Sequence, residues 1–162
     1  EDEKCFRLVG TDGGAKMSKS LGNCIYLSDE PEVIKQKVFS MYTDPNHINV
    51  SDPGCVEGNV VFTYLDVFSS KEDFEKYLPE FESLDELKAA YQKGGVGDVK
   101  IKKFLFKILD EFLTPIREKR QELERDMNFV YDILKRGTEE ARNVAKVNMK
   151  EFKRAMQINY FE

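Results

Sequence analysis

Apolar positions recur every three or four residues along much of this sequence, the spacing that places side chains on one face of an α-helix. The longest such run follows Asp98, which we expect to cap the helix, and Pro115 inside the run predicts a kink. Its apolar face comprises Ile101, Phe104, Leu105, Ile108, Leu109, Phe112, Leu113, Ile116, Leu123 and Met127. The pattern therefore predicts one long amphipathic helix as the main element of the second half.

Shorter helices are predicted before and after the long one. The segment Ser28–Glu32 combines a capping residue, an early proline and acidic residues, so a helix should start there and end by Tyr42. Residues 59–69 are apolar on nearly every side, which also suits a strand, but Asn59 is a good cap and favours a buried helix. The other expected helices are 71–78, 83–93 with a capping box at Ser83 and Glu86, and one that Thr138 caps after a break at Gly137.

The ends of the chain complete the predicted fold. The last helix has an apolar face that we expect to pack in the core: Ala141, Val144, Ala145, Met149, Phe152, Ala155 and Met156. Near the start, Phe6–Val9 and Cys24–Leu27 are short apolar runs that predict two strands around a loop. The coarse prediction is a mainly α protein, a helical bundle with a short strand and loop segment at the N-terminus.

The composition is that of a globular protein, with 162 residues of which 41% are apolar and 34% charged. No apolar run approaches the roughly 20 residues that span a bilayer, and no signal sequence opens the chain, so we expect a cytoplasmic protein without membrane contact. Cys5, Cys24 and Cys55 are widely spaced and His47 lacks an acidic or cysteine partner nearby, which favours free thiols over a metal site. The chain begins with Glu1, which suggests a piece of a longer protein.

The net charge of −5 is unevenly distributed. Residues 1–93 contain 10 Lys and Arg against 18 Asp and Glu, whereas residues 94–162 contain 15 against 12. A polyanion that binds away from the N-terminal lysines should therefore bind the second half. The candidate contacts are Lys100, Lys103, Arg117 and Arg120 on the polar face of the long helix; a solvated face with i,i+4 ion pairs is the alternative interpretation.

The strongest chemical signal is the stretch Gly10–Asn23, which we call the lysine loop. It holds the run Lys16-Met17-Ser18-Lys19-Ser20 between glycines. Lysines supply positive charge, hydroxyls and backbone N–H groups supply directional donors, and glycines allow close approach, so the loop suits a phosphate. It is not a P-loop, because Ala15 replaces the last glycine of that pattern and Met17 replaces the Ser or Thr that holds magnesium.

The run KMSKS resembles the second signature of the class I aminoacyl-tRNA synthetases. The downstream strings narrow the resemblance to the bacterial-type tryptophanyl-tRNA synthetases, over about Leu8 to Met156. These strings are Tyr42-Thr-Asp-Pro45, Glu57-Gly-Asn59-Val-Val-Phe62, Gly95-Val-Gly97-Asp98-Val-Lys100 and Pro115-Ile-Arg-Glu-Lys-Arg120. Val60 departs from the family, which usually has proline there.

The resemblance implies ATP-dependent activation of tryptophan, with Mg²⁺, followed by transfer to tRNA(Trp). Lys19 and Lys16 would be the catalytic cations on the phosphates. The implied ATP-binding residues are Lys16, Met17, Ser18, Lys19 and Ser20, and the implied hinges of loop closure are Gly10, Gly13, Gly14 and Gly22. The basic face of the long helix becomes a candidate tRNA surface.

The resemblance also implies a domain organisation. Residues 1–29 would be the lysine loop and the end of a Rossmann-type catalytic domain, 30–137 a helical anticodon-binding domain, and 138–162 a helix that packs back on the catalytic domain. The tryptophan pocket would lie outside this chain, so the chain alone should be inactive, and the full-length enzyme should be a homodimer. The alternatives are another class I synthetase of the tryptophan and tyrosine group, and a noncatalytic helical RNA-binding or scaffold module.

Overall fold

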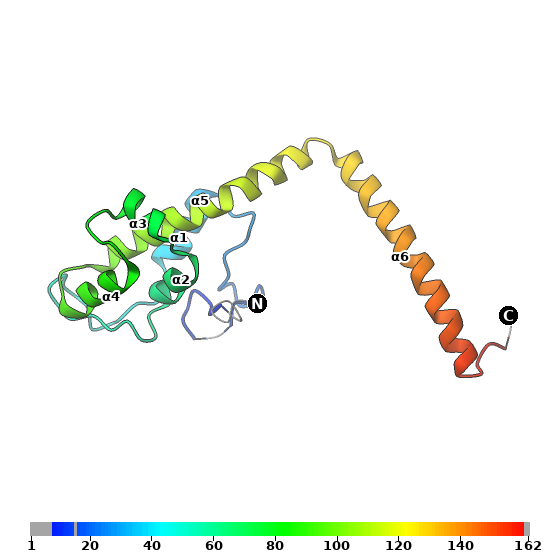
Figure 1. The fold of residues 1–162 in the computed structure, drawn as a ribbon, viewed down its shortest axis with the longest axis horizontal. Helices are drawn as coiled ribbons and strands as arrows, with labels where there is room; N and C mark the ends of the chain where they lie inside the picture. Colours follow the sequence, from blue (N-terminus) through cyan, green and yellow to red (C-terminus); the bar gives the residue numbers. More distant parts are fainter. Residues whose placement is uncertain (1–7, 15, 161–162) are drawn as a thin grey trace. The chain divides into compact units, whose positions relative to one another are not determined.

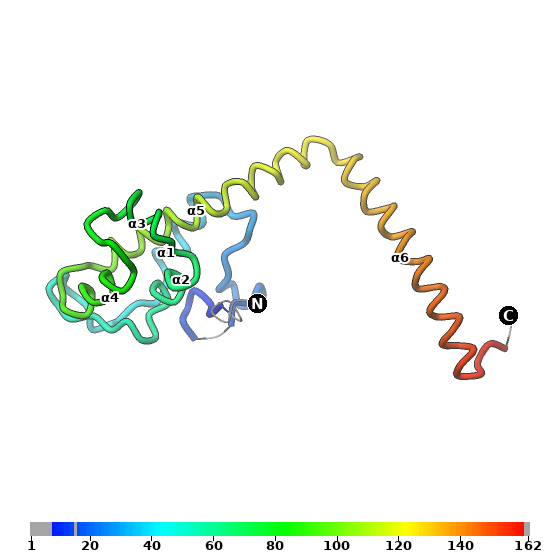
Figure 2. The backbone as a smooth tube through the Cα atoms, in the orientation of Figure 1, coloured from blue at the N-terminus to red at the C-terminus, as the bar shows by residue number. Residues whose placement is uncertain are grey.

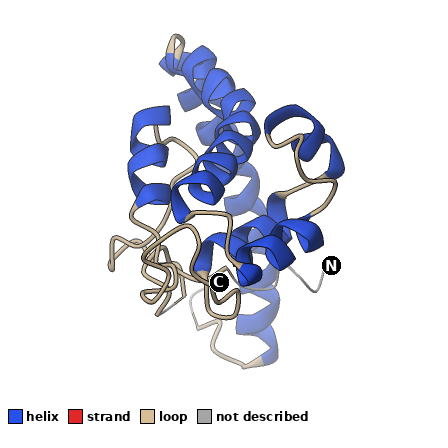
Figure 3. Ribbon diagram, turned by 90° about the vertical axis from the view of Figure 1, so that its left-hand side faces the viewer, coloured by secondary structure: helices blue, strands red, loops and turns tan. Residues whose placement is uncertain are grey.

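A computed structural model describes residues 8–14 and 16–160 of the chain. The described residues form six α-helices and no extended strand (Figures 1 and 3). In order they are α1 (Pro31–Phe39), α2 (Val60–Phe68), α3 (Lys71–Tyr77), α4 (Leu84–Lys93), α5 (Asp98–Glu124) and α6 (Met127–Ala155). The predicted mainly helical fold is confirmed.

The chain divides into two compact units, Glu1–Arg117 and Glu118–Glu162. The boundary falls inside α5, so the first unit holds α1 to α4 and most of α5, and the second holds the end of α5 and all of α6. The hydrophobic core belongs to the first unit, where α1 to α5 all contribute buried side chains. The largest of these are Tyr64, Tyr91, Phe62, Ile34, Met41, Leu65, Leu87, Ile101 and Leu105.

The two predicted N-terminal strands are wrong for the described residues. Val9 and Lys16 form one isolated antiparallel bridge, while Phe6 and Arg7 lie outside the described residues. The segment Cys24–Leu27 is loop and turn, and the tube in Figure 2 follows it without regular structure into α1. Cys24 is buried and Ile25 packs against the core, so these apolar residues are used for packing rather than for a ladder.

Local capping explains several helix starts. The Asn59 side chain accepts a hydrogen bond from the N–H of Val61 at 3.1 Å, as predicted for a buried helix at this place. The Ser83 hydroxyl accepts from the N–H of Glu86 at 3.3 Å, but the Glu86 carboxylate takes the N–H of Glu82, so the predicted reciprocal box is wrong. A reciprocal capping box that we did not predict begins α3, between Ser70 and Asp73.

The long helix α5 runs from Asp98 through Pro115 to Glu124. The predicted cap at Asp98 is wrong, because Asp98 lies in the first turn and its carboxylate accepts from Thr43 and Tyr91 rather than from a helix N–H. Much of its predicted apolar face is buried, namely Ile101, Phe104, Leu105, Ile108, Leu109 and Leu113. Phe112 is 55% exposed, so that part of the face extends beyond the core. The helix therefore serves as the central element against which the first unit packs.

The second unit corrects three predictions. The break at Gly137 and the cap at Thr138 are wrong, because α6 is continuous from Met127 to Ala155 and is capped by Asp126, which accepts from the N–H of Phe129 at 3.1 Å. The apolar period of Val130 and Leu134 continues in phase beyond Gly137, and one glycine inside a helix costs only about 1 kcal/mol. The expected core packing of this helix is also wrong, since none of its residues is buried. Over the described part of the chain, no helix combines the length and apolar character needed to cross a membrane.

Candidate functional site

The lysine loop is shaped by two tight turns. The N–H of Gly13 donates to the carbonyl of Gly10 at 3.0 Å, and the N–H of Gly22 donates to the carbonyl of Lys19 at 3.2 Å. Gly13 and Gly22 have φ values of 75° and 68°, a region that glycine enters without strain. Between the turns, the N–H of Met17 reaches the carbonyl of Leu8 at 3.3 Å. The lysine loop thus resembles a hairpin whose base is joined by the hydrogen bond between Met17 and Leu8.

The predicted phosphate-binding side chains are brought together on this loop. Lys16 and Lys19 are exposed, and neither joins any ion pair formed among the described residues. The hydroxyls of Ser18 and Ser20 lie 3.0 Å apart. Met17 is half-buried and packs against the core. Two free cations and two adjacent hydroxyls can meet an anion without first breaking an ion pair.

Asn23 is a site residue that sequence reasoning missed. Its side chain is buried, and its Nδ2 donates to both Oδ1 and Oδ2 of Asp12 at 3.1 Å. Its Oδ1 accepts from the N–H of Ser18 at 2.8 Å, and its backbone carbonyl accepts from the N–H of Thr11 at 3.0 Å. One amide thereby joins the two arms of the loop. The presence of Asn23 at the end of the glycine-bearing stretch was the only sequence signal for it.

The other two predicted hinge glycines differ from Gly13 and Gly22. A Cβ on Gly10 would lie 2.1 Å from Nδ2 of Asn23, so this glycine is required by close packing. A Cβ on Gly14 would meet nothing within 4 Å among the described atoms, and Gly14 has no positive φ. Glycine is therefore required for different physical reasons at Gly10, Gly13 and Gly22, and nothing requires it at Gly14 among the described atoms. The role of the four glycines as hinges stays a prediction.

The base of the lysine loop is fastened to the helical core through main-chain groups. The N–H of Tyr42 donates to the carbonyl of Thr11 at 3.2 Å, and the carbonyl of Tyr42 accepts from the N–H of Val60 at 3.3 Å. The hydroxyl of Tyr64 in α2 donates to the carbonyl of Val9 at 2.8 Å. Burial raises the pKa of Tyr64 to about 12, which keeps that hydroxyl protonated as a donor. The loop and the helices thus form one connected structure.

Lys102 on α5 extends this connection. Its Nζ donates to the carbonyls of Phe39 and Met41 at 3.0 and 2.9 Å, at the end of α1. Burial lowers the pKa of Lys102, although nearby Asp98 acts in the opposite direction. The residue that follows Met41 is Tyr42, which holds the loop. Lys102 therefore fixes the segment Phe39–Tyr42, to which the lysine loop is hydrogen-bonded.

Two of the strings that suggested a family meet in space. A surface hollow of about 250 Å³ is lined by residues of both strings and of the loop between them, namely Tyr42, Asp44, Pro45, Asn46, Cys55, Glu57, Gly58 and Asn59. The Asp44 carboxylate accepts from the N–H of Cys55 at 2.8 Å and so closes the loop between the strings. These strings thus build the surface next to the base of the lysine loop.

A partly buried polar network fixes the loop before α2 to the start of α5. The Asp98 carboxylate accepts from Thr43 Oγ1 at 2.6 Å and from the Tyr91 hydroxyl at 2.7 Å, and it lies 2.9 Å from Nδ1 of His47. Burial acts to raise the pKa of Asp98, but the three hydrogen bonds outweigh it and lower that pKa. Burial also raises the pKa of Tyr91. His47 is only 8% exposed. Its partner Asp98 lies 51 residues away in the sequence, so the spacing of neighbouring residues could not predict the pair.

The candidate tRNA contacts on α5 are largely engaged within the chain. Lys100 Nζ lies 2.6 Å from a carboxylate oxygen of Glu80, and Arg120 Nε lies 2.8 Å from Glu124. Arg117 is buried and its Nη2 lies 2.6 Å from Asp110, which must release it before it can reach a phosphate. Lys103 joins none of the ion pairs of the described residues.

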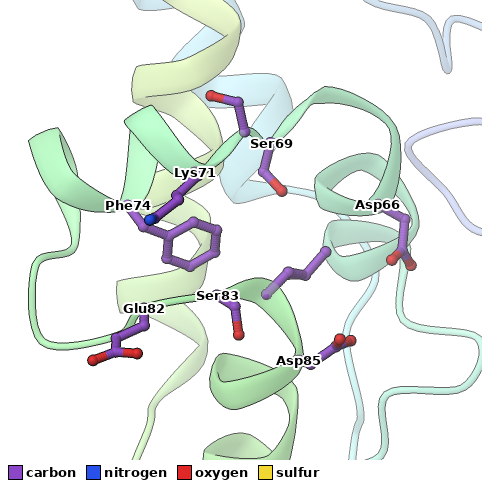
Figure 4. Close-up of a pocket in the computed structure, with 9 residues that line it drawn as sticks. Asp66, Ser69, Lys71, Phe74, Glu82, Ser83 and Asp85 are labelled. Atoms are coloured by element: carbon purple, nitrogen blue, oxygen red, sulfur yellow. The ribbon is translucent and has the colours of Figure 1, made fainter.

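A further surface hollow, of about 370 Å³, lies where α2, α3 and α4 approach one another (Figure 4). Figure 4 shows Lys71 and Phe74 of α3 facing Ser83 and Asp85 at the start of α4. Asp66 and Glu82 add carboxylates to the lining, so its charge does not suit a phosphate. None of the sequence-predicted site residues lines it.

Comparison with known proteins identifies relatives of the whole chain. It is 58% identical over 155 residues to the tryptophan–tRNA ligase of Clostridium longisporum, covering 96% of this chain and 43% of that protein. It is 54% identical over 162 residues to the tryptophan–tRNA ligase of Lactococcus lactis, covering all of this chain and 46% of that protein. The chain thus spans less than half the length of these relatives.

A solved structure agrees with the sequence relatives. The tryptophanyl-tRNA synthetase of Campylobacter jejuni, complexed with ADP and tryptophan, has a TM-score of 0.72 and 28% identity, over 93% of this chain and 43% of that chain. Residues 6–114 match the family described as tRNA synthetases class I (W and Y), a range that includes the lysine loop and α1 to α4. The chain therefore belongs to the class I tRNA synthetases of the tryptophan and tyrosine group.

Proposed function

We propose that this chain is the part of a tryptophan–tRNA ligase that provides the lysine loop and a tRNA-binding helical region. The observation that supports this most directly is the pair of exposed lysines, Lys16 and Lys19, on a loop that hydrogen-bonds to the helical core. The two ligases compared above are 58% and 54% identical to this chain. Tryptophan would bind in a part of the longer protein that this chain does not cover.

The residues present fit the phosphates of ATP. Lys16 and Lys19 supply cations, Ser18 and Ser20 supply hydroxyl donors, and Gly22 permits the turn that follows them. MgATP would supply an electrophilic α-phosphate and pyrophosphate as the leaving group. No cluster of carboxylates, cysteines or histidines suited to a metal occurs among the described residues, so in this chain the phosphates, rather than protein ligands, would hold the magnesium ion.

The two lysines have different proposed roles. Lys16 is next to the braced stem, where it forms the bridge with Val9, and would hold the triphosphate in both the ground state and the transition state. Lys19 lies in the outer turn that ends at Gly22 and would reach the phosphates only when the loop closes. A cation that meets the growing negative charge only on closure stabilises the transition state more than the bound substrate. Met17 would keep the loop seated on the core during closure.

Loop closure is proposed to turn at the glycines. Gly13 and Gly22 already have positive φ and sit at the two turns, so changes of backbone angle there encounter little steric resistance. Gly10 and Gly14 remain proposed hinges, although Gly10 also accommodates Asn23. Closure driven by the correct substrates would make the cations available only when tryptophan and ATP are both bound.

The helical region is proposed to bind tRNA(Trp), with residues 30–137 as the anticodon-binding domain and 138–162 as a helix that returns to the catalytic domain. Lys103 is the contact that needs no ion pair to open. Lys100 and Arg120 would have to exchange an exposed carboxylate for a phosphate, a small cost for surface pairs. Arg117 would have to leave Asp110, its ion-pair partner within α5, before it could contact the RNA. The complete enzyme is proposed to be a cytoplasmic homodimer.

Exchange of pyrophosphate into ATP by the full-length protein tests the proposed reaction. The expected result is exchange that depends on tryptophan and is not supported by tyrosine, because a site for one side chain rejects an analogue that leaves its polar groups unpaired. Exchange with tyrosine instead would assign the chain to the other branch of the family. No exchange with any amino acid would contradict the proposed enzyme.

Filter binding of transcribed tRNAs at several salt concentrations separates a ligase from a noncatalytic RNA-binding module. Selective retention of tRNA(Trp) across the salt series supports the ligase. Binding that falls steeply with salt and does not discriminate among tRNAs is the behaviour of a general phosphate-binding surface and favours the module. The isolated 162-residue chain serves as a comparison, and it is expected to bind tRNA more weakly than the full-length protein.

A further inference from the structure

One hydrogen bond of Asn23 holds the backbone between the two lysines. Through its side chain it reaches Asp12 on the first arm of the lysine loop and the N–H of Ser18 in the second arm. Ser18 is the residue between Met17 and Lys19, so this bond fixes the chain immediately before Lys19. Lys16 and Lys19 themselves take no part through their ammonium groups. The backbone is therefore restrained while both cations stay free.

The neighbourhood of Asn23 is built for a close fit. Asn23 is 4% exposed, and Gly10 lies so near that a Cβ there would be 2.1 Å from Nδ2. Asp12 is exposed, yet both of its carboxylate oxygens accept from the same Nδ2 at 3.1 Å. An amide that donates to a carboxylate and accepts from a backbone N–H uses both ends of its dipole, which defines one orientation of the side chain.

We propose that Asn23 and Asp12 form a latch that positions the lysine loop for catalysis. The latch acts through the Ser18 N–H: it sets the direction in which the chain leaves the stem, and hence the starting position of Lys19. Asn23 and Asp12 are positioning residues, since neither side chain is required to touch the phosphates. The predicted effect of the latch on kcat rests on the proposed ligase function. Its predicted effect on the mobility of the lysine loop rests on the loop geometry alone.

Exchanging the two chemical groups is a stringent test of the latch. Asn23→Asp keeps the acceptor for the Ser18 N–H but sets a carboxylate against the carboxylate of Asp12, which replaces a hydrogen bond with like-charge repulsion. Adding Asp12→Asn restores one amide and one carboxylate with the positions reversed. The double variant should therefore recover what Asn23→Asp loses, and such recovery is the signature of a direct pair.

The first readout is limited trypsin digestion of the full-length protein, since trypsin cleaves after lysine and both lysines of the loop are exposed. Asn23→Asp is expected to speed cleavage at Lys16 and Lys19 by about tenfold, relative to the other lysines, because the restraint on the loop is lost. The Asp12→Asn/Asn23→Asp protein is expected to return to within about threefold of wild type. A change in overall stability would instead raise cleavage at all sites.

The second readout is tryptophan-dependent pyrophosphate exchange by the same proteins. The expected result for Asn23→Asp is a fall of about tenfold or more in kcat with little change in the KM for tryptophan, because the cation is misplaced while the amino-acid pocket is untouched. The double variant should regain most of kcat. A matched control is Asn49→Asp, because Asn49 Nδ2 donates to an Asp52 carboxylate oxygen at 3.1 Å in a different loop. It should leave both readouts unchanged.

The outcomes separate the latch from the ligase. Cleavage at Lys16 and Lys19 that is equal in Asn23→Asp and wild type overturns the latch, and so does a double variant as impaired as Asn23→Asp. If Asn23→Asp fails to fold, the double variant still decides, because a latch predicts that it folds and digests like wild type. If the wild type itself shows no exchange, the proposed ligase fails while the trypsin result still stands for the latch.

Discussion

The two units of this chain share one sequence pattern and differ in what covers it. In the first unit the apolar face of α5 is buried with α1 to α4, and Ile101 and Leu105 are completely enclosed. In the second unit α6 has an apolar face of the same period, yet Val144 and Phe152 are each 62% exposed. A helical period therefore identifies an apolar face, and only the presence of partner side chains makes that face a core.

The charged residues of the first unit and of α6 differ in the same way. Lys100 and Arg117 on α5 pair with acidic residues from the same unit. Lys146, Lys150 and Lys153 on α6 join none of the ion pairs formed among the described residues. The first unit is thus stabilised by tertiary contacts among α1 to α5.

The largest predicted difference comes from removing side-chain volume in each unit. Leu105→Ala should lower the free energy of unfolding of the first unit by about 2–5 kcal/mol, because the side chain is fully buried and leaves a cavity. Val144→Ala on α6 should change stability by no more than about 0.5 kcal/mol. Urea unfolding followed by tyrosine near-ultraviolet circular dichroism measures both, and equal effects would contradict the comparison.

A smaller effect is predicted for the polar network of the first unit. Asp98→Ala should cost about 1–3 kcal/mol, because Tyr91 and Thr43 lose a partly buried acceptor. The matched change Asp132→Ala on exposed α6 should cost no more than about 0.5 kcal/mol. Urea midpoints of the two variants at pH 7 provide the measurement.

The same network predicts a pH dependence. Since hydrogen bonds lower the folded-state pKa of Asp98, its contribution is present above the ordinary value of 3.8 and is lost as the pH falls through the lower folded value. Stability of the wild type should therefore fall more steeply below about pH 3.8 than that of Asp98→Asn. If stability depends on pH in the same way in the two proteins, the predicted contribution of the Asp98 hydrogen bonds is contradicted.

Effects of opposite sign are predicted at two glycines. Gly94→Ala should destabilise by about 1–3 kcal/mol, because φ is 81° and the new Cβ would lie 2.2 Å from the carbonyl oxygen of Ser51. Gly137→Ala should stabilise α6 by about 0.5–1 kcal/mol, because a Cβ there meets nothing within 4 Å among the described atoms. Circular dichroism at 222 nm and thermal midpoints provide the measurement. Loss of helicity in Gly137→Ala would mean that the helix is broken there.

The elements that could be predicted from sequence are those that depend on neighbouring residues. The Asn59 cap and the apolar faces of α2 and α5 follow from spacings of two to four residues, and the structure confirms them. Gly137 was mistaken for a helix end because glycine weakens a helix without ending it, and the phase of the apolar residues on both sides was the better signal. The strands near the start were overestimated because a short apolar run equally suits packing in a loop.

The candidate site divides in the same way. The run from Lys16 to Ser20 is contiguous, so its chemistry was readable. The groups that brace it are not, since Asn23 and Asp12 are 11 residues apart and Tyr64 reaches Val9 across 55 residues. Which residues hold a loop in place depends on packing at long range, and no local pattern predicted that.

The central claim is that the lysine loop places Lys19 on the phosphates of ATP during tryptophan activation. The most direct measurement is kcat for tryptophan-dependent pyrophosphate exchange by the full-length protein with Lys19→Ala. A preorganised charge of this kind is usually worth roughly 10²-fold or more, so a loss of that size, with an unchanged KM for tryptophan, is expected. A loss below about tenfold would contradict the role assigned to Lys19.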